Sequence, residues 1–290
     1  MSEYRMPHTP LRPRRSVILT VVMALLLIYT LVPLAWLVIS ATKSNSDLVN
    51  TFGFAFGHFN LIANIRQVFT YENGVYGHWL VNTLIYVVAG AGGATVLATL
   101  GGYGLAKYDF RGKKAVLAVI LGAVAVPGTA LAVPTFLLFS KVGLTNTMWA
   151  VILPSLISPF GLFLMWVFVT EAIPSELLEA ARVDGSGELR TFATISLRLL
   201  APGIVTVALF AIVATWNNYF LPLIMLSDPK LYPLTVGLQS WNAETVGVGA
   251  KPVFSLITTG SLLAVIPIVA AFLLLQRYWQ SGLSAGSVKQ

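Results

Sequence analysis

Charged side chains, which acid–base, metal and ion-pair chemistry all require, are scarce in this sequence and gather in one segment. Asp, Glu, Lys and Arg make up 10% of the 290 residues, against about a quarter in an average soluble domain. The segment 171–198, between two apolar stretches, contains Glu171, Glu176, Glu179, Arg182, Asp184, Glu188, Arg190 and Arg198. This polar segment is therefore the first candidate for a functional site.

The first half of the polar segment has the signals of a short helix. Ser175 is a suitable N-cap, Glu176 favours the first turn, and Gly185 after Asp184 suits the positive φ at which many helices end. The predicted helix has about ten residues and is roughly 15 Å long. At about 100° per residue, one face carries Leu177, Leu178 and Ala181, and the opposite face carries Glu176, Glu179 and Val183.

The second half predicts another helix that starts after Gly187 and has a polar row formed by Arg190, Thr194 and Arg198. An amphipathic helix resting on a membrane, with its arginines against phosphates, would explain this row. The same explanation fits the first helix poorly, because its acidic residues would face anionic lipid and Ala180 and Ala181 supply little apolar area. Small residues flanked by charges favour docking against another protein.

The remainder of the chain is apolar enough to lie in a membrane. Hydrophobic residues make up 57% of it, and the mean hydropathy is +0.81. A hydrocarbon core of about 30 Å takes roughly 20 helical residues, and six uncharged runs satisfy this length: 16–42, 73–106, 115–140, 142–170, 199–227 and 252–276. Because the runs are continuously apolar, they predict an all-α polytopic bundle of six transmembrane helices rather than a β-barrel.

The first run is longer than the apolar region of a signal peptide and no A-x-A cleavage site follows it, so we expect it to be retained.

Lys and Arg in the loops set the orientation. With the N-terminus in the cytoplasm, that side receives thirteen of them: Arg5, Arg12, Arg14, Arg15, Lys107, Arg111, Lys113, Lys114, Arg182, Arg190, Arg198, Arg277 and Lys289. The other side receives five: Lys43, Arg66, Lys141, Lys230 and Lys251. Both termini and the polar segment are thus predicted to be cytoplasmic, and the net charge of +7 reflects topology and anionic lipid, not nucleic acid.

Groups that could drive transport or catalysis are missing from the apolar runs. None holds Asp, Glu, Lys or Arg at depth, and the three histidines lie in the tail, an external segment and a helix edge. Ion-coupled pumps and intramembrane hydrolases need such groups. There is no G-x-x-x-x-G-K-[ST] phosphate loop and no cysteine. Uphill transport would therefore need energy from a partner; a facilitator or secondary transporter working alone is the main alternative, and a membrane enzyme a distant third.

Several features predict how the helices pack. Pro127 and Pro134 are expected to interrupt the third helix, and Pro154 and Pro159 the fourth, as breaks of this kind line cavities in some transporters. The small residues of 89–104, AGAGGATVLATLGGYG, allow close approach of a neighbouring backbone. The external segment 43–78, with its TFGFAFGHFN stretch, is either a structured lid on the membrane surface or an interfacial aromatic belt.

The sequence of 173–202, IPSELLEAARVDGSGELRTFATISLRLLAP, resembles the cytoplasmic EAA loop of binding-protein-dependent ABC importers. The positions that match the motif are Glu179, Ala180, Ala181, Asp184, Gly185 and Pro202. In the branch that serves maltose, glycerol phosphate and multiple sugars, "IP" precedes the motif, as it does here; Arg198 departs from the Pro usual there. The resemblance extends to HWLVNTLIYV (78–87), YGLAKYDFRGKK (103–114), KVGLTNTMWAVILP (141–154), WNNYFLPLIML (216–226) and RYWQSGLSAGSVK (277–289).

The resemblance implies a MetI-like permease fold, most similar to the six-helix second permease of the maltose transporter. It divides the chain into an N-terminal tail (1–15), a transmembrane domain (16–276) containing the coupling loop 171–202, and a C-terminal tail (277–290). It further implies a multi-pass protein of the bacterial inner membrane that is not an enzyme. The expected partners are a second homologous permease, two ATPase subunits that hold the ATP and Mg, and an external solute-binding protein; no cofactor is expected in this chain.

The resemblance also assigns candidate residues. The ATPase-coupling helix and its turn would comprise Leu177, Glu179, Ala180, Ala181, Asp184 and Gly185. A candidate translocation path comprises Trp216, Asn217, Asn218 and Tyr219, although helix packing by Trp216 and a backbone hydrogen bond from Asn217 explain these residues equally well. The loop 228–257 would face the solute-binding protein, or be ordinary surface, and the tail 282–289 would reach the ATPase dimer.

Overall fold

The computed structural model describes residues 16–285, and throughout this range the regular elements are helices. The predicted tail 1–15 and the end of the C-terminal tail, 286–290, lie outside the described residues. The elements are α1 (Val17–Ala41), α2 (Asn45–Asn50), α3 (Leu61–Thr70), η1 (Tyr71–Gly74), α4 (Val75–Tyr86), η2 (Val87–Ala91), α5 (Gly92–Lys107), α6 (Lys113–Val124), η3 (Gly128–Leu131), α7 (Ala132–Lys141), α8 (Trp149–Ser155), α9 (Pro159–Ala172), α10 (Ser175–Val183), α11 (Glu188–Thr191), η4 (Phe192–Ser196), α12 (Leu197–Trp216), α13 (Phe220–Met225), η5 (Pro229–Leu231), α14 (Leu234–Ala243) and α15 (Phe254–Ala285).

The prediction of six spans is confirmed when one bent pair of helices is counted as a single span. Five stretches are long and apolar enough to cross a membrane: Val17–Ala41, Leu61–Lys107, Trp149–Ala172, Glu188–Trp216 and Phe254–Gln276. The sixth is a pair, Lys113–Val124 and Gly128–Lys141, which meet at 97°. α15 continues to Ala285, beyond the predicted boundary of the membrane domain at residue 276.

Proline explains two of the breaks. The bend between Lys113–Val124 and Gly128–Lys141 falls at Pro127, as predicted. The interruption predicted at Pro134 is wrong. Pro134 is the third residue of α7, where the backbone N–H would have no partner within the helix, so the ring does no harm. The fourth predicted helix is interrupted after Pro154, and α9 begins at Pro159 with Ser158 capping the N–H of Gly161 at 3.1 Å.

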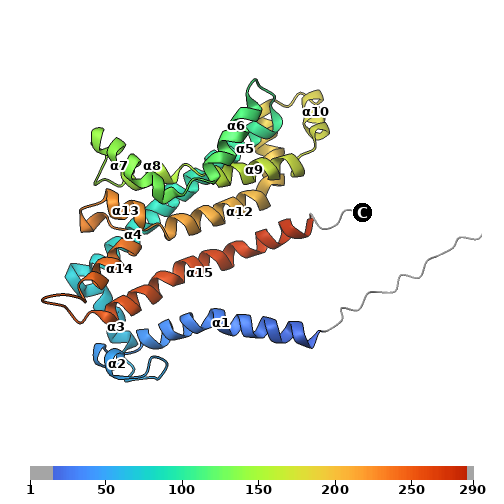
Figure 1. Cartoon of the computed structure of the whole chain (residues 1–290). Coiled ribbons are helices and arrows are strands. Elements are labelled where there is room, and N and C mark those ends of the chain that lie inside the picture. The colour runs from blue at the N-terminus through green and yellow to red at the C-terminus, as the bar shows by residue number, and fades with distance from the viewer. Residues whose placement is uncertain (1–15, 286–290) are drawn as a thin grey trace, which may run out of the picture.

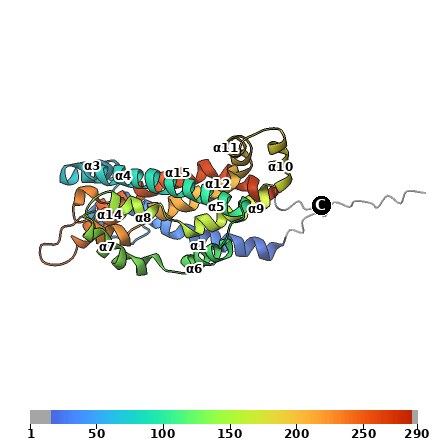
Figure 2. The same cartoon turned by 90° about the horizontal axis from the view of Figure 1, so that it is seen from above.

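The bundle has two distinct ends. Both views place α10 and the C-terminal end of α15 at one end, and α3 and α14 at the other (Figures 1 and 2). The turn after α5 lies with α10, because Tyr108 bonds to Glu188 there. The loops that the positive charges assign to the cytoplasm thus share one end of the molecule.

The glycines of 89–104 pack α5 against α9, as the small side chains predict. A Cβ on Gly102 would lie 2.7 Å from Cβ of Met165 and 2.8 Å from the backbone nitrogen of Trp166. Gly101 is covered by the side chain of Leu162 of α9, and Gly93 by that of Leu156, just before α9. Close backbone approach of this kind gains dispersion contacts where the hydrophobic effect contributes little.

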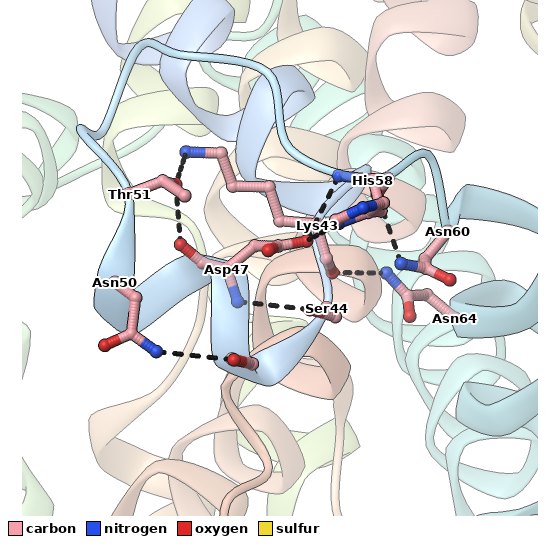
Figure 3. A network of polar contacts seen from close by, with 9 residues as sticks. Lys43, Ser44, Asp47, Asn50, Thr51, His58, Asn60 and Asn64 are labelled. Atoms are coloured by element: carbon pink, nitrogen blue, oxygen red, sulfur yellow. Dashed lines mark hydrogen bonds and ion pairs between the residues drawn. The ribbon is translucent and has the colours of Figure 1, made fainter.

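The segment after α1 is structured by a buried lysine (Figure 3). Lys43 is 1% exposed, and its ammonium group donates to Oγ1 of Thr51 at 3.0 Å and to the carbonyls of Phe52 at 2.9 Å and Gly53 at 3.3 Å. The Asn64 amide donates to the carbonyl of Lys43 at 2.8 Å. These bonds fold 43–60 back onto α3, so the segment is ordered; its role as a lid stays a prediction.

Candidate functional site

The polar segment forms a short helix that ends as the sequence predicts. α10 runs from Ser175 to Val183, and Gly185 follows with φ +76°. The N–H of Gly185 donates to the carbonyl of Arg182 at 3.0 Å, and the N–H of Ser186 to that of Ala181 at 2.9 Å. This pair of bonds is the Schellman motif, in which a residue of positive φ closes a helix.

The predicted N-cap is wrong. Pro174 occupies the cap position, and no side chain bonds to the first N–H groups of α10. Ser175 already has a place in the first helical turn, because the fixed φ of Pro174 and its extended ψ of 143° lead directly into the helix. The start of α10 therefore rests on its attachment to the bundle and not on a hydroxyl cap.

One face of α10 packs on the membrane-spanning helices. Leu178 and Ala181 are 5% and 6% exposed, and Leu178 belongs to a cluster with Tyr103 of α5, Val169 of α9 and Leu200 of α12. The buried face of α10 thus belongs to the same cluster as side chains of three spanning helices.

The other face of α10 is exposed. Glu179, Ala180, Asp184 and Gly185 are all exposed, and the side chain of Val183 is 88% exposed. Leu177, which the helical wheel places with Leu178, is 36% exposed. Leu189, just beyond the turn, is 86% exposed. The helix therefore presents acidic and apolar groups outward, while Ala181, one of the six predicted coupling residues, faces the bundle.

Two residues at the end of α5 hold the polar segment at both sides of α10. The ammonium group of Lys107 donates to the carbonyl of Ile173, just before α10. The hydroxyl of Tyr108 donates to Oε2 of Glu188 at 3.1 Å, just after it. Nε of Arg182 donates to the other oxygen of Glu188 at 2.7 Å. Partial burial and the bond to Glu188 raise the pKa of the Tyr108 phenol, so this group stays a neutral donor at physiological pH.

The second half of the segment is the beginning of a spanning helix. α11, the π-helical turn η4 and α12 follow one another without a break from Glu188 to Trp216, which confirms the helix start predicted after Gly187. Arg190, Thr194 and Arg198 are all exposed, as the polar row requires. With Arg in place of the usual Pro at position 198, the backbone passes through this point as regular helix.

The four candidate path residues lie where α12 ends, and they do not form one lining. Trp216 is buried at 7% exposure in a cluster with Trp79, Trp241 and Leu256. The Asn217 amide donates to the carbonyl of Val213 at 2.9 Å, and the carbonyl of Asn218 accepts from Oγ1 of Thr235 at 2.7 Å. Internal contacts thus account for Trp216 and Asn217. Tyr219 lines a cavity beside α14 and α15, to whose lining the other three do not contribute.

The part of the chain after residue 94 identifies the protein family. Residues 95–284 match the family described as "Binding-protein-dependent transport system inner membrane component". This stretch contains the whole of the polar segment and four of the spanning elements. The chain belongs to this family. It is therefore an inner-membrane transport subunit and not an enzyme.

Individual relatives match over three quarters or more of this inner-membrane component. The arabinooligosaccharides transport system permease protein AraQ of Halalkalibacterium halodurans is 30% identical, over 96% of this chain and 98% of its own. The melibiose/raffinose/stachyose import permease protein MelC of Bacillus subtilis is 32% identical, over 76% and 78%. A chain from the crystal structure of a bacterial ABC transporter that imports the acidic polysaccharide alginate has the same fold, with a TM-score of 0.77, 22% identity, and coverage of 93% and 100%.

Sequence reasoning missed the residues that hold the polar segment of this transport subunit. The sequence gives Lys107 and Tyr108 no role in positioning the polar segment, yet both bond to it. Their partners lie 66 and 80 residues away, and no local pattern signals such pairs. Within 16–285 there is no group of three His, Cys, Asp or Glu side chains that could hold a metal ion.

Proposed function

We propose that this chain is a permease subunit of an ABC importer for a sugar or sugar-like solute, and that it forms half of the translocation pathway with a second homologous permease. The names of its relatives, which transport arabinooligosaccharides and melibiose, support the solute class. The side chains of α1 are exposed along almost the whole helix, as expected of a helix that faces lipid or a second membrane subunit.

The coupling role rests on one observation: α10 stands at the end of the bundle with one face buried in a cluster that includes side chains of three spanning helices, and with the other face exposed. The exposed face, formed by Leu177, Glu179, Ala180 and Val183, would insert into a cleft of a separate ATPase subunit. Asp184 and Gly185 form the turn that ends this contact. Leu178 and Ala181 would carry the movement inward, to α5, α9 and α12. ATP and Mg would then be bound by the two ATPase chains.

The opposite end of the bundle supports a contact with an external solute-binding protein. The loop after α14, within the predicted region 228–257, carries Val246 at 72% exposure and a fully exposed Val248. Gly247 and Gly249 alternate with them and have φ of +94° and +83°. An exposed apolar tip on a glycine-rich loop suits insertion into a partner.

Reconstitution of the complete assembly in liposomes tests this function. Uptake of a sugar should require ATP, the ATPase subunits and the binding protein; uptake by this chain alone would instead support a facilitator. Ala180→Arg should leave the protein inserted and abolish uptake, because a bulky charge would occupy the docking face. Ala115→Arg, on an exposed site near the start of α6 and outside the polar segment, is the control. Normal uptake by Ala180→Arg would contradict the coupling role.

A further inference from the structure

α14 is held rigidly by its buried face. Leu234, Gly237 and Trp241 are buried, and the ring of Trp241 lies 4.8 Å from that of Trp79 of α4. Gly237 admits no side chain, because a Cβ there would lie 2.1 Å from the Trp79 ring. The indole N–H of Trp79 donates to the carbonyl of Pro229 at 2.9 Å. The outer face of α14 is therefore presented in a fixed position.

That outer face lines a cavity of about 460 Å³. Thr235, Leu238, Gln239 and Asn242 have the i, i+3, i+4, i+7 spacing of one helix face. Tyr219, after α12, and Ile257 and Ser261, from α15, complete the lining. The volume lies within the roughly 300–1,000 Å³ of sites for small molecules.

Four polar side chains of the cavity have no hydrogen-bond partner within the part of the chain that the structure describes. Thr235 is occupied by its bond to Asn218. For the side chains of Tyr219, Gln239, Asn242 and Ser261, no hydrogen bond occurs among the described residues. Two amides and two hydroxyls can each donate and accept, which matches the hydroxyl groups of a sugar. Leu238 and Ile257 supply the apolar surface that a ring's C–H groups contact.

The cavity is also uncharged. Its lining contains no Asp, Glu, Lys, Arg or His. The nearest acidic group along α14 is Glu244, which Lys251 pairs at 2.8 Å, and this bond holds the pKa of Lys251 above its usual range. A carboxylate entering the cavity would lose hydration and meet no opposite charge.

We propose that this cavity is a subsite for a neutral, hydroxyl-rich solute and selects against uronates. The inference rests on the proposed function and names the solute class of the importer. Gln239, Asn242, Ser261 and Tyr219 bind hydroxyl groups, and Leu238 and Ile257 contact the ring. A sugar leaving the binding protein would meet this subsite on the predicted external half of the path.

The absence of cysteine from the chain permits a direct test with single reporter thiols. Leu238→Cys and Ser261→Cys place a thiol in the cavity and keep both amides, whereas Ala243→Cys, exposed on the same helix and outside the lining, is the control. The purified assembly in nanodiscs is treated with a methanethiosulfonate reagent in the presence of raffinose, maltotriose, α-1,5-arabinotriose or trigalacturonate. Protection scales as 1 + [L]/Kd, so a probe at about four times its Kd should slow the reporters about fivefold.

The expected result is protection of both cavity thiols by at least one neutral sugar, with Ala243→Cys unprotected and trigalacturonate without effect. Equal protection by trigalacturonate would overturn the selectivity. If the cavity thiols do not react with the methanethiosulfonate reagent even without sugar, another subunit covers the cavity, and the proposed subsite is overturned. If ATP-dependent uptake of a neutral sugar is intact but no sugar protects, the subsite fails and the proposed function stands. If no sugar is taken up with ATP, the proposed function itself fails.

Discussion

Substitution of Gly185 offers the most direct measurement of what holds α10 in place. Its φ of +76° is required by the Schellman bonds that close α10, and a Cβ at this position would meet no atom within 4 Å. Gly185→Ala therefore adds no steric clash and costs only the left-handed backbone, about 1–2 kcal/mol. Asn tolerates this region better than Ala. Pro cannot adopt it and also removes the N–H that donates to Arg182.

A cost of about 1–2 kcal/mol changes a local equilibrium by a factor of about 5–30. Amide hydrogen exchange in the assembly should show this acceleration for residues 180–186 in Gly185→Ala, less in Gly185→Asn, and the largest in Gly185→Pro. Sugar uptake per ATP hydrolysed should fall in the same order, with equal amounts of inserted protein. Equal exchange in the Ala and Asn variants would refute the backbone argument, and normal uptake by the Pro variant would refute the role of the turn.

Three other substitutions test the packing and the polar contacts. Gly102→Leu should lower the thermal unfolding midpoint of the detergent-purified protein, because overpacking against Met165 costs about 1–3 kcal/mol or more. Gly104→Leu should not lower it, because a Cβ at that position meets open space. Equal shifts in the two variants would contradict the close approach of α5 and α9. Glu188→Gln should loosen the end of α10 and weaken the coupling of ATP hydrolysis to uptake, most clearly at low salt. If this variant couples hydrolysis to uptake normally, the contact of Glu188 with Arg182 and Tyr108 is incidental. Lys43→Met removes a buried donor to three acceptors, and each of these bonds is worth about 1.5–3 kcal/mol. Limited proteolysis should therefore cut residues 51–59 faster in this variant. Unchanged cleavage would show that the lysine does not hold this segment.

Local signals in the polar segment were sufficient for part of the site. Asp184 and Gly185 marked the end of α10, and Gly187 the start of the next helix, because both depend on residues within one turn of each other. The helical wheel failed for Leu177, which is partly exposed, since a wheel does not say where the neighbouring helices lie. The cap predicted at Ser175 failed because Pro174 before it changes the backbone entering the helix.

The candidate path residues also depend on tertiary contacts that the local sequence does not encode. The sequence predicts one continuous apolar run over 199–227, whereas α12 ends at Trp216 and a separate short helix, α13, follows. The sequence could not say that Trp216 would be buried against Trp79 and Trp241 while Tyr219 faces a cavity. α14 was not recognised as a lining element, because its polar row has meaning only beside Tyr219 and Ser261.

The sequence by itself determined that the chain lies in a membrane, how many times it crosses, which loops share a side, and where α10 ends. These properties follow from hydropathy, charge and turn residues that act within about twenty positions of one another. Only the tertiary structure decided which face of α10 is free, that Lys107 and Tyr108 hold it, and that the amides of α14 meet at one cavity. Such contacts join residues far apart in the chain, and their free energies depend on geometry that no local pattern encodes.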